Sequence, residues 1–192
     1  MKNIIKNCLL LMVVMFMSSC GYNSMVNLDE KVQGQWADVE AAYQRRADLI
    51  PNLVKTVKGL ADFERGTLEA VVNARASATK IEIDPSNLTA ENMKQFEAAQ
   101  GKVSGALSRL LLTFERYPEL KADKGFLELQ AQLEGTENRI SVERQKFNET
   151  VEGYNTMVRS FPQAAYAGML GFDKKAYFES KEGADEAPDV EF

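Results

Sequence analysis

The chain has 192 residues, of which 23 are basic, 28 are acidic and none is histidine. An acidic chain without a basic cluster is a poor match for nucleic acid, so we expect no nucleic-acid partner. Without histidine, Ser-His-Asp and Cys-His catalysis and most zinc sites are excluded, so we expect no enzyme, no metal and no cofactor.

The first 20 residues have the layout of a bacterial lipoprotein signal. Lys2 and Lys6 precede ten consecutive apolar residues, 8–17, and small residues then lead to Cys20. The apolar run is shorter than the roughly 20 residues that span a bilayer and is typical of a cleaved signal. We therefore predict a signal peptide over residues 1–19 and lipidation of Cys20. The alternatives are an uncleaved anchor and an ordinary secretory signal.

Cleavage before Cys20 would leave an acidic mature chain with no free thiol. It would remove Lys2, Lys6 and Cys8 but no acidic residue, so the net charge would change from −5 to −7. The lipid on Cys20 would tie the protein to a membrane of the cell envelope, outside the cytoplasm. Gly21 stands where an acidic residue commonly retains lipoproteins in the inner membrane, which favours the periplasmic side of the outer membrane.

Residues 23–79 predict one long helix. Their apolar stripe advances by four and three residues in turn, which is the spacing of a helix that packs lengthwise against partners. The stripe keeps its phase through Pro51, so we expect a continuous helix that is kinked near this proline. The stripe comprises Val32, Trp36, Val39, Tyr43, Arg46, Ile50, Leu53, Val57, Leu60 and Glu64.

The rest of the chain predicts two further long helices and one short helix. Turn-forming residues at 84–87 end the first segment, and Pro118 and Asp123 mark the boundary between the next two helices. The expected helices cover residues 88–116, 124–160 and 163–170.

These elements predict an all-α fold, an elongated antiparallel bundle of about four helices over residues 20–180. Short connections make neighbouring helices run in opposite directions. With three long passes, the first and last helices would run parallel to each other. Residues 181–192 are acidic and poor in apolar side chains, so we expect a disordered tail.

Charged residues on or near the apolar stripes predict a structural polar network. A buried charge is costly unless it is paired. The expected parallel arrangement brings Glu64 to the height of Arg144 and Arg139, so we expect Glu64 to pair with one of them. A network that fixes helix register is favoured over a polar pocket or proton site. The network comprises Arg46, Glu64, Arg75, Glu137, Arg139 and Arg144.

Several blocks resemble the signature of the LemA family. The clearest is Arg45-Arg46-Ala47-Asp48-Leu49-Ile50-Pro51-Asn52-Leu53-Val54-Lys55-Thr56-Val57-Lys58-Gly59, followed by Glu64 and Ala74-Arg75. The C-terminal blocks are Glu137-Asn138-Arg139-Ile140, Arg144, Phe147-Asn148, Tyr154-Asn155, Phe161-Pro162 and Gly171-Phe172. The resemblance covers residues 22–179.

The resemblance implies a membrane-anchored bundle of four helices with no established enzymatic activity. It also implies a role in membrane compartments or in the cell envelope. The chain departs from the family pattern at two places. Members typically carry an uncleaved transmembrane helix where this chain has a lipoprotein-type signal, and they often have histidine where this chain has Phe63.

Three functions are compatible with these features. The favoured one is a non-enzymatic envelope scaffold or adaptor that binds protein partners, or a second copy of itself, through helix faces. The alternative is a lipid or small-molecule carrier with a cavity inside the bundle. An enzyme that uses the carboxylates of Glu64 and Glu137 is the least supported, because no nucleophile, metal motif or glycine loop accompanies them.

Overall fold

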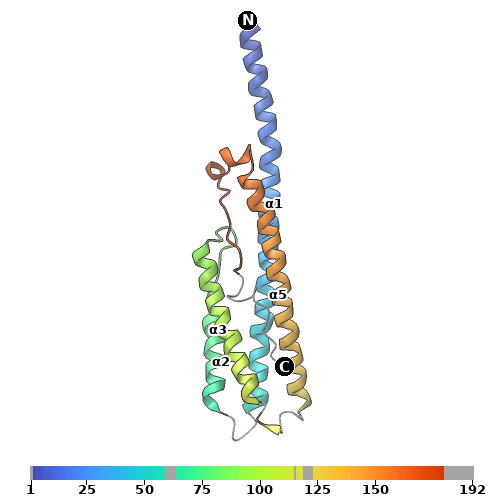
Figure 1. Cartoon of the computed structure of the whole chain (residues 1–192), viewed down its shortest axis with the longest axis vertical. Helices are drawn as coiled ribbons and strands as arrows, with labels where there is room; N and C mark the ends of the chain where they lie inside the picture. The colour runs from blue at the N-terminus through green and yellow to red at the C-terminus, as the bar shows by residue number, and fades with distance from the viewer. Residues whose placement is uncertain (1, 59–63, 115, 119–122, 180–192) are drawn as a thin grey trace, which may run out of the picture.

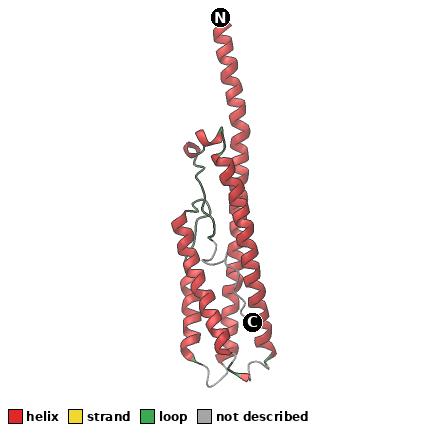
Figure 2. Ribbon diagram, viewed as in Figure 1, coloured by secondary structure: helices red, strands yellow, loops and turns green. Residues whose placement is uncertain are grey.

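The computed structural model describes residues 2–58, 64–114, 116–118 and 123–179, with side chains described from residue 21 onward. All regular secondary structure in these ranges is helical (Figure 2), which confirms the predicted all-α class. The elements are α1 (Lys2–Lys58), α2 (Arg65–Ala78), α3 (Ala90–Phe114), α5 (Lys124–Arg159), and the 3-10 turns η1 (Gln163–Ala165) and η2 (Gly168–Leu170).

Two expectations lie outside the described part of the chain. The lipidation of Cys20 falls on a side chain that is not described, and the expected tail at 181–192 is not described either. A search of the described residues found no helix with the length and apolar content of a bilayer span.

The four long helices run up and down in sequence, so α1 and α5 are antiparallel neighbours (Figure 1). α2 and α3 form a second antiparallel pair beside them. The expected parallel alignment of the first and last helices is therefore wrong. The segment 23–79 holds two helices, because α1 ends at Lys58 and α2 begins at Arg65, so the chain makes four long passes.

α1 passes through Pro51 without a break, as expected. Its apolar stripe is buried as far as the structure describes it. Glu64 is an exception, because it precedes α2 and its side chain is 62% exposed. The buried stripe residues are Val32, Trp36, Val39, Tyr43, Arg46, Ile50, Leu53 and Val57.

The hydrophobic core has two parts along the bundle axis. The first surrounds Trp36, whose ring lies 5.2 Å from Phe96 and 5.5 Å from Phe147 between centroids. The second lies toward the distal end of the bundle, where α1 and α3 end, and there Phe114 stacks on Phe126 at 3.7 Å. Aromatic pairs of this kind stabilise a core beyond the area they bury.

A C-terminal segment, residues 172–179, runs back along the bundle after η2 (Figure 1). We call it the strap. It begins after Gly171, whose φ of 83° lies in the left-handed region that glycine adopts without steric cost. Near its end Phe178 stacks on Trp36 at 5.9 Å, so the strap contributes to the core itself.

Candidate functional site

Arg46 is the centre of a polar layer between the two parts of the core. Its side chain is 1% exposed. Nη1 donates to Oε1 of Glu137 at 2.6 Å and to Oγ of Ser104 at 2.7 Å. Nη2 donates to Oε1 of Gln100 at 2.7 Å. We call Arg46, Gln100, Ser104 and Glu137 the Arg46 layer, and it joins α1, α3 and α5 at one height.

The two charges of this layer have different surroundings. Arg46 is enclosed, whereas the side chain of Glu137 is 42% exposed. The guanidinium also lies over the ring of Tyr43, 5.1 Å from its centroid. Burial raises the pKa of the Tyr43 hydroxyl even though the positive charges of Arg144 and Arg46 oppose that rise. Tyr43 is therefore a neutral neighbour of the buried cation at physiological pH.

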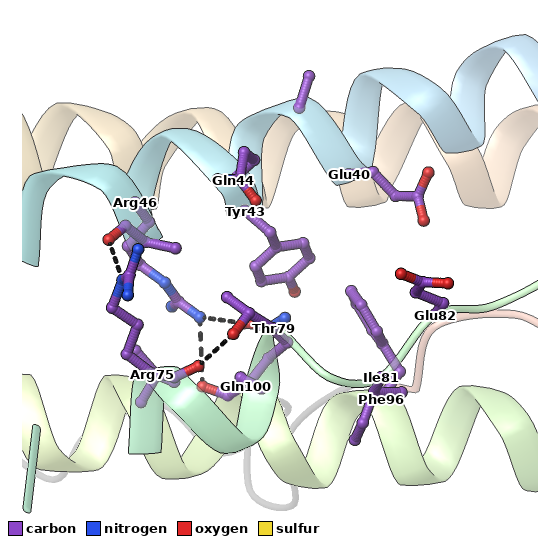
Figure 3. Close-up of a pocket in the computed structure, with 14 residues that line it drawn as sticks. Glu40, Tyr43, Gln44, Arg46, Arg75, Thr79, Ile81, Glu82, Phe96 and Gln100 are labelled. Carbon is purple, nitrogen blue, oxygen red and sulfur yellow. Dashed lines mark hydrogen bonds between the residues drawn. The ribbon is translucent and has the colours of Figure 1, made fainter. Parts of the chain in front are cut away.

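Arg75 fills a hydrogen-bonding position that Pro51 leaves open. Pro51 has no backbone N–H, so it cannot donate to the carbonyl of Ala47 four residues earlier. Nε of Arg75 donates to this carbonyl at 2.7 Å (Figure 3). The interaction ties α2 to α1 and satisfies an acceptor that the helix cannot satisfy itself.

The other predicted network residues lie apart from one another. Arg144 pairs with Glu97 at 2.6 Å and also donates to the strap carbonyl of Glu179 at 3.0 Å. Arg139 pairs within its own helix with Glu143 at 2.7 Å. The expected pairing of Glu64 with Arg144 or Arg139 is wrong.

Glu64 instead lies 4.0 Å from Arg116, and both side chains are largely exposed. The reason is the extra helical pass, which places the start of α2 at the distal end of the bundle (Figure 1). The structure therefore does not bring Glu64 together with Glu137, which pairs with Arg46. The carboxylate pair that an enzyme would require is not formed by these two residues.

Glu143 is a buried carboxylate that the sequence analysis missed. It accepts from Gln35 on α1 at 2.8 Å and from Lys146 at 3.2 Å, besides its pairing with Arg139. Burial alone would raise its pKa, but the donors and the nearby positive charges outweigh burial and lower it. Its spacing between Ile140 and Phe147 would have placed it on the inner face of α5.

A pocket of about 340 Å³ lies beside the Arg46 layer, between α1, α2 and α3. Figure 3 shows the side chains of Glu40 and Glu82 at one end of it and those of Arg75 and Gln100 at the other. Burial raises the pKa of Glu40, and the neighbouring charge of Glu82 adds to the rise. Within the described residues, no group of three or more potential ligands could hold a metal ion.

Two asparagines of α5 bind the strap backbone. Asn155 donates to the carbonyl of Lys175 and accepts from its N–H, both at 2.9 Å. Asn148 makes the same two bonds to Phe178, at 3.0 and 2.8 Å. Each side-chain amide thus supplies the donor and the acceptor that a neighbouring strand would otherwise offer to an extended backbone.

Sequence reasoning did not predict this role, although a signal is present. Phe147-Asn148 and Tyr154-Asn155 repeat an aromatic-Asn dipeptide with a seven-residue spacing, which is two helical turns. In each dipeptide the aromatic residue is buried in the core and the asparagine holds the strap.

An all-helical bundle with an internal polar layer and a C-terminal strap is the class of protein that these features define. The model of the LemA family matches residues 35–192, which is most of the chain. The chain belongs to the LemA family, as the resemblance of its sequence blocks indicated.

Named relatives fall into two groups. The chain is 25% identical over 181 residues to magnetosome protein MamQ of Magnetospirillum gryphiswaldense and to magnetosome protein MamQ 2 of Paramagnetospirillum magneticum. The match covers 85% of this chain and 66% of those proteins, so the chain spans slightly under two thirds of their length. Protein LemA of Metamycoplasma hominis is 22% identical over 160 residues, covering 83% of this chain and 69% of that protein.

Proposed function

We propose that the protein is a lipid-anchored scaffold of the cell envelope, without enzymatic activity, that binds protein partners through its helix faces. The lipid is on Cys20, and the bundle lies on the periplasmic side, at the outer membrane. Membership of the LemA family and the similarity to magnetosome proteins support an association with a membrane.

The observation that carries the proposal is the position of Cys20 relative to the packed bundle. Gly21 directly follows the cysteine and already lies against η1, because a Cβ built there would come within 2.6 Å of the Tyr166 hydroxyl and 3.2 Å of the Gln163 amide. Met25 is fully buried. A lipid at Cys20 would therefore join the membrane to the end of the bundle without an intervening linker.

Metabolic labelling with a palmitate analogue tests the anchor. We expect the native chain to incorporate the label and to sediment with membranes, and Cys20→Ala to lose both properties. Retention of residues 1–19 on the purified native protein, without label, would contradict the proposal.

The partner face that we propose is a hollow between α1 and α5 on the outside of the bundle. It is lined by small residues, among them Ala41 and Gly135, next to the charged side chains of Arg45, Asp48 and Arg139. The small residues would let the backbone of a partner helix come close, and the neighbouring charges of both signs could pair with a helix that carries both acidic and basic residues. Its volume of about 920 Å³ is large enough for several side chains of such a helix.

A photo-crosslinking amino acid at Asn52, which lines this hollow, tests the face in intact cells. The matched control is the same amino acid at Lys102, an exposed position on α3. We expect discrete cross-linked species from position 52 and not from position 102. The absence of cross-links from position 52, with normal membrane sedimentation, would contradict the scaffold.

The pocket beside Arg46 supports a second candidate function, a carrier of small molecules. Its volume of about 340 Å³ lies at the lower end of ligand sites, which range from about 300 to 1,000 Å³. Native mass spectrometry of the purified protein tests this function. A carrier requires a retained ligand mass that Tyr43→Ala diminishes, and a bare protein mass contradicts it.

A further inference from the structure

Large apolar side chains are concentrated at one end of the bundle. Eight such side chains are exposed in the described part of the chain, and four of them belong to this end. Phe161 is 89% exposed and Met169 is 82% exposed, which makes them the two most exposed of the eight. We call Tyr22, Phe161, Met169 and Leu170 the apolar cap.

The cap lies at the end of the bundle that holds the first residues after Cys20. Tyr22 contacts Phe172 edge-on, with 5.6 Å between ring centroids. Gly21 lies against Tyr166 of the loop that carries the cap. Figure 1 shows η1 and η2 beside α1 at the point where this helix leaves the bundle. The cap and the proposed lipid therefore share one end of the molecule.

The chain carries no charged residue in either segment that builds this end. Residues 21–28, which follow the proposed lipid site, contain none, and neither do residues 160–172, although 27% of the whole chain is charged. An apolar medium could cover this end without the cost of desolvating a charge. The acidic remainder of the protein would stay farther from anionic lipids, which would repel it.

We propose that the apolar cap inserts into the headgroup region of the membrane, so that the bundle stands on the bilayer with its axis away from the surface. This inference rests on the proposed anchor at Cys20. We name a lipid bilayer as the partner that covers the apolar cap, because the anchor would hold this end of the bundle next to the membrane. Aromatic side chains favour that boundary, and exposed apolar area adds to the binding that one lipid chain provides.

Depth-dependent fluorescence quenching in reconstituted vesicles tests the inference. The full chain, extracted from membranes, is placed in vesicles of phosphatidylcholine and phosphatidylglycerol, with or without brominated acyl chains. Phe161→Trp reports on the cap. Leu112→Trp is the matched control, because Leu112 is 65% exposed in the last turn of α3 at the distal end. Trp36 is buried in all variants and its signal is subtracted with the native chain.

We expect brominated lipid to reduce the added emission of Phe161→Trp and to leave that of Leu112→Trp unchanged. This quenching of Phe161→Trp should persist at high salt, since salt screens interactions between charges and does not weaken apolar insertion. Vesicle flotation is measured in parallel. Flotation without quenching of Phe161→Trp would overturn the cap and leave the anchor intact, as would equal quenching of both variants. Failure to float would overturn the anchor and the cap together.

Discussion

The pairing of Arg46 with Glu137 is unequal in its exposure to water. Arg46 is enclosed by the core and by Tyr43, whereas Glu137 keeps part of its carboxylate in solvent. Removing the partner of a buried charge is costly, because the remaining charge cannot recover its hydration. Removing the buried member leaves a partner that water can reach. Removal of the Glu137 side chain should therefore destabilise the protein more than removal of the Arg46 side chain.

We predict that Glu137→Ala destabilises the protein by about 3 kcal/mol, because it leaves Arg46 charged and enclosed. Arg46→Met should cost less, about 1–2 kcal/mol, for the lost hydrogen bonds. Urea denaturation with an unchanged slope measures both values. Glu64→Gln is the control and should cost less than about 0.5 kcal/mol, since its ion pair is exposed. A larger cost for Arg46→Met than for Glu137→Ala would refute this explanation.

A second residue-scale prediction concerns the dependence of stability on pH. The pKa of Glu40 is raised in the folded protein by burial and by Glu82. Its carboxylate therefore disfavours folding at pH 7, and this penalty fades as the pH falls to the value for free glutamic acid, about 4.3.

Glu40→Gln should accordingly raise the urea midpoint at pH 7 and have no effect near pH 3, where the carboxyl is protonated in both states. The gain should stay below about 1 kcal/mol, because the Glu40 side chain is only partly buried and solvent still screens its charge. The exposed Glu69 on α2 provides the matched control, Glu69→Gln. A destabilised Glu40→Gln protein at pH 7 would contradict the prediction.

At the scale of the element, a proline inside α1 determines how α2 is attached. Pro51 leaves the Ala47 carbonyl without its helical donor, and Arg75 supplies one from the neighbouring helix. The effect of Pro51 on stability therefore depends on α2, and the role of Arg75 depends on α1. The proline costs α1 a hydrogen bond and at the same time creates the acceptor to which α2 binds.

A double-mutant cycle tests this connection. Arg75→Met should cost about 1.5–2 kcal/mol in the native chain, since a charged donor is lost from a backbone acceptor. In Pro51→Ala the helix regains its own donor to Ala47, so the same change should cost about 1 kcal/mol less. Urea denaturation of the four proteins gives the coupling. Additive costs, within about 0.3–0.5 kcal/mol, would show that the two residues are independent.

The strap yields a prediction for hydrogen exchange. Asn155→Ala removes both bonds to the backbone of Lys175, which should cost about 1–3 kcal/mol and speed amide exchange over residues 172–179. Exchange followed by mass spectrometry measures the effect. Asn138→Ala, at an exposed position of the same helix, should leave the strap protected. Unchanged protection in Asn155→Ala would mean that Phe178 and Lys175 hold the strap without the asparagine.

The sequence predicted the all-α bundle of about four helices, but it predicted three long passes where the structure has four. The stripe from Val32 to Val57 indicated a buried seam, and its unbroken phase correctly carried α1 through Pro51. The same phase continues to Glu64, which concealed the end of α1 at Lys58. Helix-end signals were present, because Lys55 and Lys58 precede Gly59.

That single miss determined what could be predicted of the candidate site. Arg46 and Glu137 were recognised as charges on or near the stripes, but the parallel model assigned the wrong partners to Glu64 and Arg144. Contacts between helices depend on the direction in which each helix runs, and one extra pass reverses every later helix. The strap was missed for a different reason, because the repeat of Asn148 and Asn155 along α5 does not reveal which backbone segment the two amides bind.

At the scale of the whole molecule, the Arg46 layer divides an otherwise continuous apolar core. Arg46 lies between Tyr43, which belongs to one part of the core, and Ile50, which belongs to the other. Replacing a buried ion pair by apolar residues of similar size is often neutral or stabilising, even where breaking it is costly. If the Arg46 layer serves to align α1, α3 and α5 and does not add stability, its apolar replacement should likewise be neutral or stabilising.

We therefore predict that the combined variant Arg46→Met, Gln100→Leu, Ser104→Ala and Glu137→Leu is at least as stable as the native chain, whereas Glu137→Ala alone is destabilised. In the combined variant no charge of the Arg46 layer remains and the two parts of the core become continuous. Urea denaturation compares the three proteins, and circular dichroism checks that helix content is kept. If the combined variant lost as much stability as Glu137→Ala, the layer would be a net source of stability and its role in register would be unsupported.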